Sequence, residues 1–138
     1  MEIRKLDRAG MPEEYGVSVQ RLVPWDALNA PFEGAWCVIA PGKATDAHSH
    51  HEYEIFIAIS GEGALEAEGE RSPFLPGDIV HFPPGVHHQV INAGDTDFQF
   101  YSVFWDTDMS EKFTTRHVAA GAEHPLPFGC KSSADAVR

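Results

Sequence analysis

The sequence predicts an all-β protein: a small, single-domain jelly-roll barrel (a double-stranded β-helix) with a short C-terminal helix. Runs of β-branched and aromatic residues recur at regular spacing, and clusters of Gly, Pro, Asn and Asp separate them. In the middle of the chain, histidines and a glutamate occupy positions of one parity, as residues on one face of a strand do. The length of 138 residues is that of one domain.

The expected strands follow one another through the middle of the chain. They cover residues 17–24, 34–40, 46–60, 63–70, 78–82, 86–91 and 97–105. Short strands at such spacing indicate an antiparallel barrel. The run from Ile55 to Ile59 is apolar on both faces, so we expect one face to point into the barrel. Ile55, Ile57 and Ile59 should then meet another sheet or a second subunit, and a homodimer is predicted.

The two ends of the chain differ from this central part. Residues 1–16 are expected to form an N-terminal arm or edge segment, followed by the barrel over 17–108. The segment Asp108-Met109-Ser110-Glu111 resembles a capping box, which predicts a short helix over 109–120. Residues 121–138 are rich in Gly, Pro, Ser and Ala, as in a linker or tail. This segment is either a frayed end or a connection to a further domain.

Composition excludes several classes of partner. The formal net charge of −11 argues against nucleic acid and anionic membranes, which attract clusters of Lys and Arg. No apolar run approaches the roughly 18 residues of a membrane span, and no signal-peptide pattern is visible. Cys37 and Cys130 lie far apart and imply no disulfide framework. A cytoplasmic protein is therefore expected.

Four residues are predicted to bind one divalent metal ion: His48, His50, Glu54 and His88. The first three share one parity and should project from one strand face, and His88 should approach from a second strand. A single histidine on a strand is more often a hydrogen-bonded structural residue, but the set of four favours a metal site. Imidazole and carboxylate ligands suit zinc, iron, manganese, nickel or copper and do not choose among them.

The remaining histidines are not expected to be ligands. His51 and His87 have the opposite parity, so a role at the surface or beside the ligands is expected for both. His81, His117 and His124 are interpreted as ordinary residues.

Ten positions at fixed spacing carry a family resemblance. They are Gly42-x5-His48-x-His50-x3-Glu54-x6-Gly61 and Gly77-x5-Pro83-x-Gly85-x2-His88-x3-Asn92. The chain resembles the cupin superfamily, and both of its motifs are complete here. This scaffold hosts oxygenases, isomerases, sugar-binding sensors and storage proteins, so the resemblance by itself implies no single activity.

The segments around the motifs narrow the resemblance. They are residues 21–25, 30–36, 48–54 and 101–106, and together they are similar to the zinc-binding cupins of hydrazine synthetases. That resemblance implies zinc as the cofactor and a methionyl-tRNA synthetase-like partner protein or domain. The partner would esterify an amino acid onto the hydroxyl oxygen of an N-hydroxylated lysine. The cupin would then rearrange this amino-acid-derived ester: its α-amine attacks the ester-linked nitrogen, the N–O bond breaks and an N–N bond forms.

Three aromatic residues are candidate walls of the substrate pocket: Trp36, Phe56 and Tyr101. Packing in the barrel core explains each of them at least as well. No residue can be assigned as the base that keeps the amine neutral. Two alternatives remain open, an iron- or manganese-dependent dioxygenase and a non-catalytic cupin that binds a small ligand or sugar. Metal identity and oxygen uptake separate them from the rearrangement.

Overall fold

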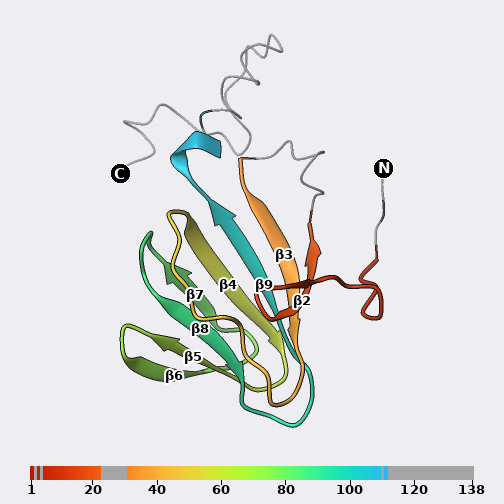
Figure 1. Ribbon diagram of the computed structural model, residues 1–138. Helices are drawn as coiled ribbons and strands as arrows, with labels where there is room; N and C mark the ends of the chain where they lie inside the picture. Colours follow the sequence, from red (N-terminus) through yellow and green to blue (C-terminus); the bar gives the residue numbers. More distant parts are fainter. Residues whose placement is uncertain (2, 4, 23–30, 110, 112–138) are drawn as a thin grey trace.

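Two antiparallel sheets form the barrel in the computed structural model, which describes residues 1, 3, 5–22, 31–109 and 111 (Figure 1). The six-stranded sheet has the order β1-β2-β3-β9-β4-β7, and the three-stranded sheet has the order β6-β5-β8. In the larger sheet the strands are β1 (Glu13–Glu14), β2 (Val17–Arg21), β3 (Glu33–Ile39), β4 (Tyr53–Ser60), β7 (Ile79–Phe82) and β9 (Phe98–Trp105). In the smaller sheet they are β5 (Gly63–Ala67), β6 (Glu70–Phe74) and β8 (His88–Asn92).

The core lies between the inner faces of the two sheets, as the all-β prediction requires. Along β4 the inward residues Glu54, Phe56 and Ala58 are buried. Along β9 the inward residues Phe98 and Phe100 are buried as well. Phe74 of the smaller sheet packs on Phe98, with ring centroids 5.7 Å apart. Removal of this apolar surface from water is the main term that stabilises the fold.

Two predicted strands differ from the observed ones. The strand expected over 46–60 begins at Tyr53, because residues 44–50 cross over to lie beside β8 instead. The strand expected over 63–70 is a hairpin, β5 and β6, with Glu68 and Gly69 in the turn at φ 53° and 79°. Two successive residues with positive φ form the turn that suits a two-residue hairpin.

The N-terminal arm lies along β2. The side chain of Gln20 accepts a hydrogen bond from the Asp7 amide and donates one to the Lys5 carbonyl. Strand β1 then extends the edge of the larger sheet. The arm therefore includes a short edge strand.

A helix begins at residue 107, after β9. Its capping residue is Asp106, whose Oδ1 accepts a hydrogen bond from the Met109 amide at 2.7 Å. The expectation that Asp108 starts the capping box was wrong by two residues, because β9 ends at Trp105. Except for residues 109 and 111, the predicted helix and the tail over 121–138 lie outside the described residues, as do His117, His124 and Cys130. Among the described residues, no helix is long and apolar enough to cross a membrane.

The outer face of the larger sheet is apolar and partly exposed. Ile59 and Ile79 are 41% and 68% exposed, and Tyr53 is 38% exposed. At the described outward positions of β3, β4, β7 and β9 there is no Asp, Glu, Lys or Arg. In a chain with a net charge of −11, such a face can meet a second copy of itself without electrostatic repulsion. The homodimer predicted from Ile55, Ile57 and Ile59 stays a prediction, and this is the face at which we expect the two copies to meet.

We expect the wild-type chain to form a dimer and Ile57→Lys to be a monomer, because the substitution would bury two ammonium groups where the copies meet. Size-exclusion chromatography with light scattering measures the mass. Leu75→Lys is the matched control, since Leu75 is 44% exposed but lies outside this face. A wild-type monomer at micromolar concentration, or a dimer that survives Ile57→Lys, would contradict the prediction.

Candidate metal centre

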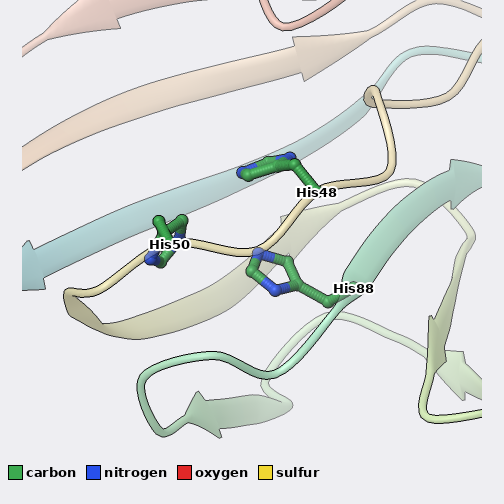
Figure 2. A group of neighbouring side chains, drawn as sticks. All are labelled: His48, His50 and His88. Atoms are coloured by element: carbon green, nitrogen blue, oxygen red, sulfur yellow. The ribbon is translucent and has the colours of Figure 1, made fainter.

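Three histidines converge at one end of the barrel interior (Figure 2). His48 and His50 lie on the irregular segment before β4, and His88 is the first residue of β8. His48 and His88 are joined by two backbone hydrogen bonds, at 3.2 and 2.9 Å. The Gly85 amide donates to the His50 carbonyl, and Gly85 adopts a φ of +84°, which a glycine tolerates best. The backbone thus fixes all three positions.

The orientation of the three rings suits a metal ion. Nδ1 of His48 lies 2.7 Å from the Asp46 carbonyl oxygen, and Nδ1 of His88 lies 2.8 Å from that of Val86. Nδ1 of His50 is similarly 3.2 Å from the Glu52 carbonyl. Because a carbonyl only accepts, the tautomer with the proton on Nδ1 would donate to these carbonyls and offer each Nε2 lone pair to an ion, whereas without an ion Nε2 of His50 and Nε2 of His88 can instead donate to Glu54. Metal-binding histidines are oriented in this way.

Glu54 lies against two of these histidines. Its Oε1 is 2.9 Å from Nε2 of His50 and 3.1 Å from Nε2 of His88. Two ligand atoms that are each about 2.1 Å from one ion are roughly 3 Å apart when they are neighbours around it. The structure thus brings the three predicted histidines together and places Glu54 against two of them, and Glu54 as a fourth ligand stays a prediction.

Glu54 is an ionised carboxylate. Burial by itself would raise the pKa of Glu54, but hydrogen bonds from His88, Ser102 and His50 together outweigh burial and lower that pKa below its usual value. Ser102 donates from Oγ to the other carboxylate oxygen, Oε2, at 2.7 Å. A negative charge is thus held ready in the centre.

A cavity of about 120 Å³ adjoins the histidines. At about 30 Å³ for each water molecule, this volume would hold roughly four waters, or a small organic ligand. Phe56 contributes to its wall. Trp36 and Tyr101 are not among its lining residues: they pair across β3 and β9 on the outer face, with ring centroids 5.0 Å apart. The prediction that Trp36 and Tyr101 line the pocket was wrong, because both residues have the opposite parity to the inward-facing Ala35 and Ser102.

Cys37 lies in the same cavity but is not a nucleophile. Burial, with a smaller contribution from the charge of Glu54, raises the pKa of the Cys37 thiol to about 12. It therefore stays protonated at neutral pH and behaves as a small apolar residue.

The other described histidines lie away from the centre. The side chain of His51 is 78% exposed, and its Nε2 is 3.0 Å from Asp106 Oδ2. His87 is exposed on the turn before His88. His81 is exposed on the outer face, where its ring lies nearly parallel to those of Tyr53 and Trp105.

Three residues of the site were not predicted from the sequence: Tyr15, Arg21 and Ser102. The Tyr15 ring stacks on His48 at 5.2 Å, and Tyr15 has a φ of 54° because it forms the β1–β2 turn with Gly16. Arg21 lines the cavity from the end of β2. The inward parity of β2 could have identified Arg21, but the register between β4 and β9 is needed to place Ser102 beside Glu54.

The fold and the site together define a jelly-roll barrel with a candidate metal centre between its sheets. Residues 35–104 match the model of the cupin domain, so the chain belongs to the cupin family. A solved cupin barrel-domain protein from Salinispora arenicola is 53% identical, with a TM-score of 0.79 over 85% of this chain and 98% of that one.

Two curated relatives are more distant. An oxalate-binding protein from Thermotoga maritima is 33% identical over 47% of this chain and 54% of its own length. A 5-nitrosalicylic acid 1,2-dioxygenase from Bradyrhizobium is 27% identical over 66% of this chain and 51% of its own length. The chain spans about half the length of both relatives. The family is thus established, and it includes proteins that bind small acids and proteins that act on them.

Proposed function

We propose that this chain is a metal-dependent cupin enzyme whose ion is bound by His48, His50, Glu54 and His88. One observation carries the proposal: each of the three histidines offers a ring nitrogen within 4.8 Å of the other two, and the carboxylate of Glu54 lies about one ligand separation from Nε2 of His50 and of His88.

The reaction proposed is the rearrangement of an amino-acyl ester of an N-hydroxylated lysine into a hydrazine. The α-amine forms a bond to the ester-linked nitrogen, the N–O bond breaks, and its electron pair leaves with the carboxylate. One amine proton is lost to solvent, and no oxidant is consumed. A bound divalent ion, with zinc favoured, supplies a Lewis acid that stabilises the negative charge of the leaving carboxylate.

The chain itself positions the ester. The amine nitrogen, α-carbon, carbonyl carbon, ester oxygen and ester-linked nitrogen can close a five-membered ring, so a cavity that holds this conformation removes much of the entropic barrier. Phe56 and Phe100 form apolar walls that limit water near the reacting atoms. The ester itself has to come from an ATP-dependent, methionyl-tRNA synthetase-like partner protein or domain, as in the hydrazine synthetases that the sequence resembles.

The proposal is tested by elemental analysis of protein purified without added metal, followed by an assay of the ester. Near-stoichiometric zinc and conversion of a glycyl ester of N6-hydroxylysine to the hydrazine, followed by mass spectrometry, are expected. Release of free glycine without the hydrazine would show hydrolysis only and would refute the rearrangement. A chain that binds no metal would be a binding module.

A dioxygenase is the second candidate, because three histidines with one glutamate also suit iron or manganese and one relative is a dioxygenase. Iron or manganese in the purified protein, with oxygen consumed in proportion to an added aromatic acid, would favour it. An oxygen electrode separates the two candidates, since the rearrangement consumes no oxygen.

A further inference from the structure

Arg21 differs in charge from the other side chains of the cavity. Among the described residues that line the cavity, it is the one lysine or arginine. Its side chain is only 16% exposed, although the chain has 21 acidic and 10 basic residues overall. We infer that Arg21 binds a carboxylate of the substrate and so determines specificity for small acids. This inference rests on the proposed function, since it assigns a second anchoring point in the same site.

The register of the larger sheet places Arg21 relative to the metal centre. Arg21 pairs with Ala35, and Ala35 pairs with Ser102, so the three share one row on the inner face. Strands lie about 4.8 Å apart, which puts the backbones of Arg21 and Ser102 roughly 10 Å apart. Ser102 donates a hydrogen bond to Glu54. A row of this length can accommodate a small ligand between the guanidinium and the centre.

The residue between them leaves that space open. Ala35 presents only a methyl group to the cavity, and Cys37 on the same strand presents a small thiol. Burial is the largest cause that raises the pKa of the Cys37 thiol, and among nearby charges Glu54 raises this pKa, Arg21 lowers it and Glu14 raises it. Both charges therefore act on the same small volume.

The guanidinium is held in place by its surroundings. Arg21 Nη2 donates to Glu14 Oε1 at 2.7 Å, and the guanidinium carbon lies 5.7 Å from the centre of the Phe104 ring. A guanidinium has five N–H donors in a planar fork that matches a carboxylate. Glu14 lies at the edge of the sheet, with a side chain that is 34% exposed. The ion pair restricts the rotamer of Arg21, which lowers the entropic cost of binding a ligand.

The expected ligand has a metal-binding oxygen at one end and a carboxylate at the other. An N-hydroxylated lysine fits this description, because its hydroxylamine and its α-carboxylate lie at opposite ends of the side chain. Simple linear dicarboxylates have the same two ends and are used as probes. They test recognition without any assumption about the reaction.

Calorimetric titration of the zinc-loaded protein compares malonate, succinate, glutarate and adipate with their monomethyl esters. At least one dicarboxylate is expected to bind about tenfold or more tightly than its ester, as a charge-assisted bidentate pair would give. Arg21→Gln should remove this preference while zinc per chain stays unchanged. Arg71→Gln is the matched control, since Arg71 forms a comparable 2.9 Å pair with Glu66 on the surface of the smaller sheet.

Arg21→Lys supports the test if Arg21→Gln does not fold. Lysine keeps the positive charge without the planar fork, so the protein should bind the preferred dicarboxylate several-fold more weakly and should bind its ester as before. Two results would overturn the inference. One is equal binding of the dicarboxylate and its ester by the wild type, and the other is an undiminished preference for the dicarboxylate in a variant that lacks arginine at position 21. An Arg21-dependent preference in a protein that fails to rearrange the ester would keep the inference and refute only the proposed reaction.

Discussion

Replacing His88 with alanine is expected to strip the metal from the protein and to abolish its activity. His88 is 1% exposed and contacts Glu54, and its removal takes away the one nitrogen that the smaller sheet contributes to the cluster. Loss of one of four ligands should weaken metal binding by more than about 100-fold, since even supporting residues around a metal typically account for 10- to 100-fold. Metal per chain, measured on protein purified without added metal, checks the expectation.

His51→Ala is the control for that experiment. His51 is adjacent to a predicted ligand in sequence, yet its ring interacts with Asp106 and Glu52 at the surface. The metal content of the His51→Ala protein should equal that of the wild type. If His51→Ala removed the metal and His88→Ala did not, the assignment of the centre would be wrong.

Replacing Phe98 with alanine is expected to lower the free energy of unfolding by about 3–5 kcal/mol, a large share of the stability of a domain this size. Phe98 is fully buried, and its ring contacts those of Phe74 and Phe100. A β-carbon built on Gly63 would come within 2.6 Å of the same ring, so the surroundings are closely packed. Urea unfolding followed by tryptophan fluorescence measures the change.

Phe32→Ala is the matched control, because Phe32 is 40% exposed and the chemical change is the same. Phe32→Ala should lower the free energy of unfolding by less than about 1 kcal/mol. The folded fraction of Phe98→Ala should still bind metal, since Phe98 is not among the lining residues of the cavity. If Phe98→Ala and Phe32→Ala lowered the free energy of unfolding equally, the description of the core would be wrong.

The alternation of side chains along strands could be predicted well from the sequence. It placed Glu54 and Phe56 on the inner face of β4 and Ile55 and Ile57 on the outer face, as observed. The convergence of His48, His50 and Glu54 was also predicted, but for a partly wrong reason. The two histidines are not on the strand of Glu54: a bend at residues 51–52 separates them, and pairing with β8 positions His48.

What the sequence did not reveal depends on contacts between distant segments. Arg21 comes into line with Ser102 only through the register of three strands. Tyr15 reaches His48 because a turn with positive φ directs its ring there. Trp36 and Tyr101 were plausible pocket walls by residue type alone, and only the register showed that they face outward. Local pattern determines which face a side chain occupies, and tertiary pairing determines its neighbours.

The position of Glu54 also has a mechanical consequence. Glu54 belongs to the larger sheet and its Oε1 contacts His88 of the smaller one, so the centre is a cross-link between the two halves of the barrel. An ion held there would tie position 50 to position 88 in the folded chain, and an ion that binds only the folded chain raises the free energy of unfolding by about 4 kcal/mol when its concentration is roughly 1,000 times its dissociation constant. Uptake of metal and closure of the barrel are then one coupled equilibrium, in which the folded chain binds the ion and the ion in turn resists separation of the sheets.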